Sequence, residues 1–92
     1  MATKKYEIEA EDIFAWVEVE TRYFKDEPCE GGYEGKEYYG YKIDVIVRVG
    51  IHMLRSQVSK RDGHSYDLVC RDFKDTMDRL GFPDAEFEYD PK

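Results

Sequence analysis

Cysteine is scarce in this chain, since Cys29 and Cys70 are the two thiols among 92 residues. Two cysteines are too few for a disulfide framework or for a zinc site with four thiolate ligands. Long apolar runs are missing as well, and none approaches the roughly 18 residues that a membrane span needs. The first residues carry lysines but lack the apolar stretch of a signal peptide. We therefore expect a protein of the reducing cytoplasm that has no contact with a membrane.

Basic residues are outnumbered in the sequence. Fourteen Lys and Arg stand against 21 Asp and Glu, which gives a formal net charge of -7. Because contacts to phosphates need a basic face, this balance argues against direct binding of nucleic acid. The acidity instead favours a protein partner with a basic surface. A chain of this length supports one hydrophobic core, so we expect residues 1–92 to form a single domain.

Alternation of apolar and polar residues predicts β-strands in the first two thirds of the chain and again near its end. The strands are expected at residues 6–11, 13–25, 39–53 and 84–90. A further segment to about residue 60 either extends the third strand or turns back at residues 61–63. Residues 26–37 contain three glycines and a proline, which predicts a flexible glycine-rich loop between the second and third strands.

One segment has the period of an α-helix instead. Its apolar residues recur three or four positions apart and form one stripe: Tyr66, Val69, Cys70, Phe73, Met77 and Leu80. Gly81 follows at the position of a C-terminal cap, and Pro83 comes soon after. The pattern predicts a helix at about residues 65–80. The expected fold class is α+β, with a mostly antiparallel sheet of four to five strands and this amphipathic helix packed on one face.

Acidic side chains occupy every second position in three separate segments. On a strand such residues share one face and lie about 6.6 Å apart, which is close to the spacing of phosphates along a nucleic-acid strand. The pattern indicates an anionic docking surface, although acidic residues also serve simply to solvate an outer strand face. The Tyr- and Gly-rich residues 32–41 are typical of contact loops. The residues expected to bind the partner are Glu18, Glu20, Glu86, Glu88, Tyr33, Tyr38 and Tyr39.

Large apolar residues also occur at positions expected on the outer face of the sheet. The main examples are Phe14, Trp16 and Ile46. One helix cannot cover both faces of a sheet, so these residues predict either a second small core or an apolar surface for a homodimer or a partner. The alternative function is therefore a structural or assembly subunit that binds through this apolar face.

Signals for catalysis are weak. The sequence contains no glycine-rich phosphate loop, no nucleophile elbow and no His-Glu-x-x-His motif. The pair His52 and His64, with Arg55 between them, leaves a small RNA-processing enzyme as a further alternative. The spacing of His and Cys fits no compact metal site, and Pro28 interrupts a partial match of residues 26–37 to a calcium loop. We predict a non-enzymatic protein without a metal or cofactor.

In length, acidity and compactness the chain is similar to small acidic proteins of phages and mobile elements, some of which act as DNA mimics. That resemblance implies an inhibitor whose carboxylates take the place of phosphates and block a basic site on a host nucleic-acid-binding protein. The dependence of binding on salt concentration distinguishes this function from that of a structural or assembly subunit. An anionic interface weakens as ionic strength rises, whereas an apolar interface hardly responds.

Overall fold

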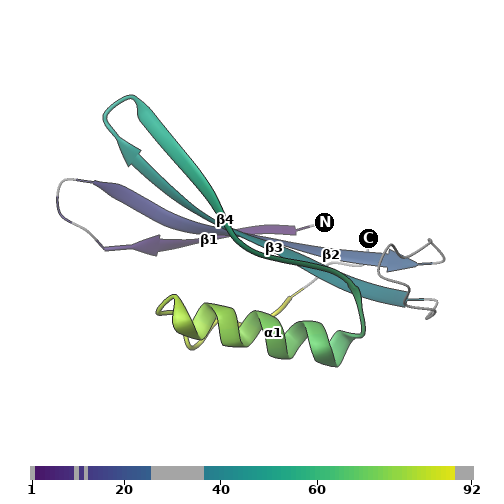
Figure 1. The fold of residues 1–92 in the computed structure, drawn as a ribbon. Coiled ribbons are helices and arrows are strands. Elements are labelled where there is room, and N and C mark those ends of the chain that lie inside the picture. The colour runs from purple at the N-terminus through teal and green to yellow at the C-terminus, as the bar shows by residue number, and fades with distance from the viewer. Residues whose placement is uncertain (1, 10, 12, 26–36, 89–92) are drawn as a thin grey trace.

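The fold, taken from a computed structural model, is a twisted antiparallel sheet with a helix on one face. The structure describes residues 2–9, 11, 13–25 and 37–88. Its elements are β1 (Ala2–Ile8), β2 (Phe14–Lys25), β3 (Glu37–Val49), β4 (His52–His64) and α1 (Tyr66–Arg79). The strands lie in sequence order, and each is antiparallel to the next (Figure 1). The predicted α+β fold with a helix packed on a mostly antiparallel sheet is confirmed.

The residues expected to form a third strand, 39–53, are divided between two strands. Gly50 and Ile51 form a two-residue turn, and Val49 pairs with His52 across it. Gly50 has a φ of +59°, the left-handed conformation that such tight hairpins favour and that glycine adopts without strain. The prediction of one continuous strand here is wrong. Strand β4 then runs on to His64, so the chain does not turn back at residues 61–63.

The predicted strand at residues 84–90 is also wrong as far as the structure describes it. Residues 85–88 are not paired as a strand, and Ala85 donates its backbone N–H to the carbonyl of Phe82 at 3.2 Å, in a turn. The alternation nevertheless appears in the burial, because Ala85 and Phe87 enter the core while Glu86 stays exposed. Residues 89–90 lie outside the described part. So does the glycine-rich loop except for Glu37, the first residue of β3.

The predicted helix and its glycine cap are confirmed. Val69, Phe73 and Met77 form the buried stripe of α1. At its end Phe82 N–H donates to Met77 O at 2.8 Å, and Gly81 N–H donates to the carbonyl of Asp78 at 3.1 Å. This is the Schellman arrangement, which needs a left-handed residue, and Gly81 has a φ of +96°. The turn sends the following residues back along the helix.

The core lies between α1 and one face of the sheet. Its buried residues are Val17, Val19, Tyr41, Ile43, Val69, Phe73, Met77, Ala85 and Phe87. The strand members sit at alternate positions of β2 and β3, which places them on one face. Tyr41 packs edge-on against Phe73, with ring centroids 5.7 Å apart. The sheet therefore has a helix side, which carries this core, and an outer side.

The sheet is longer than the helix that covers it. A 13-residue strand such as β4 spans about 43 Å, whereas the 14 residues of α1 span about 21 Å. The long axis of the molecule measures 47 Å. Figure 1 shows the β3–β4 hairpin projecting beyond the helix. About half of the helix side therefore lies beyond α1. Within the described residues no helix has the length and apolar character to cross a membrane.

Candidate binding surfaces

The four glutamates expected to bind a partner are divided between the two sides of the sheet. Glu18 and Glu20 lie on the outer side, beside Lys42 and Arg55. Glu86 and Glu88 lie on the helix side, in the segment that follows α1, where they border a hollow with Val19. The structure does not bring the two pairs together into one surface.

Glu18 and Glu20, on the outer side of the sheet, both form ion pairs with arginines. One oxygen of Glu18 accepts a hydrogen bond from the Trp16 indole N–H at 3.1 Å, and the other accepts one from Arg55 at 2.7 Å. Both hydrogen bonds lower the pKa of Glu18 below its usual value, and the bond from Trp16 has the larger effect. Glu20 accepts a hydrogen bond from Arg22 at 3.2 Å. Much of the negative charge expected on this side is therefore balanced by neighbouring arginines.

The three apolar residues expected on the outer side differ in exposure. Phe14 is 72% exposed, whereas Ile46 is fully buried. Trp16 pairs with Ile46 in the neighbouring strand and is itself half-buried, with the Lys5 ammonium 5.3 Å from its ring. Ile46 and much of Trp16 are therefore covered, and Phe14 is the member of the three that offers open surface.

The tyrosines expected in the contact loop have structural neighbours. Tyr38 is buried and stacks on Phe24 with ring centroids 4.6 Å apart. Tyr39 is half-buried and packs against Tyr23 and Tyr66. Tyr33 lies outside the described residues. The two described tyrosines therefore help to fix the sheet and its contact with α1.

The two histidines of the enzyme alternative occupy opposite ends of β4. His52 is its first residue and His64 its last, so their backbones are about 40 Å apart along the strand. Arg55, between them, is bound to Glu18 and Asp44 at 2.7 and 2.9 Å. The two histidines cannot act on one small substrate. In the part of the chain that the structure describes, no three His, Cys, Asp or Glu residues gather to hold a metal ion.

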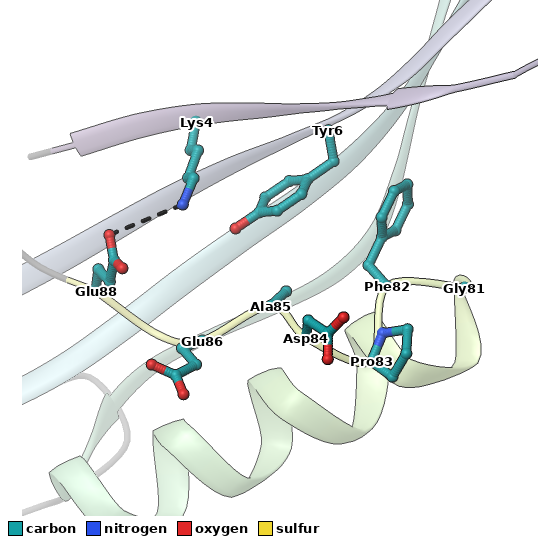
Figure 2. Close-up of a pocket in the computed structure, with 9 residues that line it drawn as sticks. All are labelled: Lys4, Tyr6, Gly81, Phe82, Pro83, Asp84, Ala85, Glu86 and Glu88. Atoms are coloured by element: carbon teal, nitrogen blue, oxygen red, sulfur yellow. Dashed lines mark ion pairs between the residues drawn. The ribbon is translucent and has the colours of Figure 1, made fainter.

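A groove between β1 and the segment after α1 brings together residues from both ends of the chain (Figure 2). We call it the acidic aromatic groove, and its volume is about 290 Å³. It is lined by Lys4, Tyr6, Gly81, Phe82, Pro83, Asp84, Ala85, Glu86 and Glu88. The rings of Tyr6 and Phe82 contact each other with centroids 5.4 Å apart. Ala85 and Phe87 anchor the segment in the core, and the residues that alternate with them, Asp84, Glu86 and Glu88, stay exposed.

The groove already holds a cation. The Lys4 ammonium lies 5.4 Å from the centroid of the Tyr6 ring and 3.9 Å from Glu88 Oε2. Both partners of this ion pair are well exposed, so it contributes little stability, about 0–1 kcal/mol. Asp84 and Glu86 add two further exposed carboxylates, which leaves the groove with an excess of negative charge. Its chemistry suits an ammonium or guanidinium group that rests on an aromatic ring beside carboxylates.

A smaller hollow of about 190 Å³ adjoins the groove and has a more apolar lining. Val19 and Phe73 contribute the apolar part, and Tyr6 is common to both hollows. Thr21 also lines it, and its buried hydroxyl oxygen has no hydrogen-bond partner within the described structure. An apolar hollow beside carboxylates can accept the aliphatic part of a long basic side chain while its charged end stays at the groove.

Sequence reasoning found Glu86 and Glu88 but missed Lys4, Tyr6, Phe82 and Asp84 as their neighbours. The available signal was the glycine cap at Gly81 followed by the apolar pair Ala85 and Phe87, which indicates a chain that returns along the helix. Comparison of the chain with protein families, curated proteins and solved structures gives no match. The geometry of the groove therefore carries the functional argument.

Proposed function

We propose that this protein is a non-catalytic interaction protein that binds a basic partner through the acidic aromatic groove. The observation that supports this proposal is the position of the Lys4 ammonium, held between the Tyr6 ring and the Glu88 carboxylate. A basic side chain of a partner takes the same place and displaces Lys4. The displacement costs little because the ion pair that is lost is exposed and 3.9 Å long.

Arginine fits the groove better than lysine. A guanidinium group is planar, stacks on aromatic rings and can bind a carboxylate through two parallel hydrogen bonds. The groove offers aromatic rings and carboxylates, since Tyr6, Phe82, Glu86 and Glu88 all line it. The net charge of -7 attracts a basic partner over a longer range and speeds the encounter at low salt.

The proposal keeps the basic partner of the sequence-based hypothesis but assigns a different set of carboxylates. Asp84, Glu86 and Glu88 alternate with Ala85 and Phe87 and are all exposed. Three carboxylates within five residues concentrate negative charge on one short segment, which supports mimicry of successive phosphates. A nucleic-acid-binding protein is accordingly the partner class that we propose. Glu18 and Glu20 have no part in this surface because arginines already bind them.

The proposal is tested with a short arginine-rich peptide as the probe, titrated into the protein and followed by NMR through the ring signals of Tyr6 and Phe82. Substitution of Glu86→Gln with Glu88→Gln should weaken binding about tenfold, since two exposed charge contacts are lost. The matched control is Asp67→Asn with Asp78→Asn, which removes two exposed carboxylates of α1. It should change the affinity less than about twofold, because those charges act only at long range.

Lys4→Ala gives an independent check, since it removes the cation that competes for the groove. Peptide affinity should rise in this variant although the protein becomes more acidic by only one charge. Equal losses in the groove and control variants would show attraction by net charge alone and would contradict the proposal. So would an unchanged affinity in the Glu86 and Glu88 variant.

A further inference from the structure

Residues that project from the outer side of the sheet line a cavity of about 520 Å³, which is separate from the acidic aromatic groove. Among them are Phe14 and Trp16 of β2, Arg48 of β3 and Glu7 of β1. Phe14 is paired with Arg48 and Trp16 with Glu7, so the four side chains share one face. The volume is in the range of sites for small organic ligands, about 300–1,000 Å³.

Trp16 forms an aromatic wall of this cavity that is fixed in advance. Its indole N–H donates to Glu18 Oε1 at 3.1 Å. The Lys5 ammonium lies 5.3 Å from the centroid of the ring and 3.9 Å from the same carboxylate oxygen. Glu18 and Phe14 lie on opposite sides of Trp16 along β2, so these contacts hold the ring from the side away from Phe14. A ligand that stacks on a ring held in this way pays little to order it.

Phe14 is the second aromatic wall, and it is 72% exposed. Side chains two positions apart on a strand are about 6.6 Å apart on the same face. One planar group can therefore contact both Phe14 and Trp16. Such a contact removes apolar surface of Phe14 from water and adds the favourable geometry of stacked rings.

Arg48 supplies a positive charge next to this aromatic pair. Within the described residues it forms no ion pair, and its Nε donates to the carbonyl oxygen of Gly50 at 3.4 Å. Arg55 of the neighbouring strand, by contrast, is bound by Glu18 and Asp44. A guanidinium group binds the oxygens of an anionic group through parallel hydrogen bonds. The cavity therefore combines a surface for an aromatic ring with a donor for an anion.

The carboxylates that line the cavity lie on its opposite flank. Glu7 belongs to β1 and Arg48 to β3, so β2 separates them and their backbones are about 10 Å apart, which is twice the strand spacing. Glu9, just after β1, is exposed and lines the cavity as well. Because these acids repel an anion, they orient a ligand with its anionic end at Arg48 and its ring on Trp16 and Phe14.

We propose that this cavity binds a small planar aromatic anion, with its ring against Trp16 and Phe14 and its anionic group at Arg48. The site goes beyond the proposed function. It shares no lining residue with the acidic aromatic groove, so each proposal can fail without the other. It also gives Phe14 and Trp16, which the sequence indicated as a surface for a dimer or a partner, a small ligand instead.

The test uses two fluorescent probes. Anilinonaphthalene sulfonate is an aromatic anion, and N-phenylnaphthylamine has the same rings without the sulfonate. Trp16 is the single tryptophan, so energy transfer from it to a probe reports binding near the cavity. Arg48→Gln should raise the dissociation constant of the sulfonate about tenfold and change that of the neutral probe less than about twofold. Arg71→Gln removes the same charge from an exposed position of α1 and is the matched control, with a change below about twofold for either probe.

Phe14→Ala tests the aromatic wall and should weaken binding of both probes about tenfold. Circular dichroism confirms that the variants are folded. Loss of affinity for the sulfonate in Arg48→Gln but not in Arg71→Gln, together with weaker binding in Phe14→Ala, supports the proposal. Absence of binding to the wild-type protein, equal effects of the two arginine variants, or an unchanged affinity in Phe14→Ala would each overturn it.

Discussion

The hydroxyl group of Tyr41 connects β3 with β4 and α1, and its removal should measurably destabilise the fold. It donates a hydrogen bond to Asp72 Oδ2 at 2.6 Å and lies 3.0 Å from Ser59 Oγ. The same carboxylate oxygen accepts a hydrogen bond from Arg61 Nε at 2.6 Å. Burial of the ring, and then the hydrogen bond to Asp72, raise the pKa of Tyr41 above its usual value. Tyr41→Phe removes the hydroxyl and keeps the ring.

The expected loss follows from these contacts. A hydrogen bond to a charged group contributes about 1.5–3 kcal/mol to stability. Asp72 keeps its bond to Arg61 in the variant, and the retained ring leaves no cavity, so the lower part of that range applies. We expect the free energy of unfolding to fall by about 1.5–2 kcal/mol. With an m-value of about 1 kcal/mol per molar urea, the unfolding midpoint falls by about 1.5–2 M.

Urea unfolding followed through the fluorescence of Trp16, the single tryptophan, measures this change. Tyr23→Phe is the matched control, because its exposed hydroxyl donates to Glu37 at 2.8 Å and should contribute less than about 0.5 kcal/mol. The raised pKa adds a pH test. The unfolded state releases the Tyr41 proton near pH 10.0 and the folded state at higher pH, so stability falls as pH rises above 10.0. Tyr41→Phe should reduce that alkaline loss. Equal effects of Tyr41→Phe and Tyr23→Phe would refute this account.

Three further predictions concern the turn after α1, the β3–β4 pairing and the outer ion pairs. Gly81→Ala forces a side chain into a φ of +96° and should destabilise the protein by at least about 1 kcal/mol in urea unfolding. Gly40→Ala should lower the melting temperature, because its Cβ would collide with the Asp62 side chain and lie 2.7 Å from the Arg61 carbonyl oxygen. The lowered pKa of Glu18 contributes stability above its unfolded value of 4.5, and that stability is lost as pH falls through the folded pKa. Glu18→Gln should therefore flatten the acid side of a stability–pH profile measured by thermal unfolding.

The parts of the fold that sequence predicts well are those fixed by local physics. The stripe containing Val69, Phe73 and Met77 has the period of a helix, and Gly81 supplies the left-handed residue that ends it. The two strands around the glycine-rich loop alternate strongly, and each has one face in the core. None of these features depends on knowing which distant segment lies beside them.

The wrong strand predictions arise where two different backbone structures produce the same alternation of apolar and polar residues. Val49, Ile51 and Met53 keep the apolar alternation across the turn at Gly50, so the pattern continues although the chain reverses. Residues 84–88 alternate in burial because Ala85 and Phe87 reach the core, but a strand also needs a paired backbone. The groove was missed for a similar reason. Lys4 and Tyr6 meet Glu88 and Phe82 only through the packing of the whole chain.

The register of the sheet also decides which acidic residues are held in ion pairs between its strands. Glu18 of β2 lies directly opposite Asp44 of β3, and two like charges in this position destabilise a sheet. Arg55 of β4 resolves the conflict by binding both carboxylates, and Lys42 adds a second cation 3.6 Å from Asp44. These acids and bases are thus required by the pairing of the strands. The carboxylates at positions 84, 86 and 88 follow α1 and lie outside the strand pairing, and the ion pair between Glu88 and Lys4 of β1 is exposed and 3.9 Å long. They are therefore the carboxylates that we propose for a basic partner.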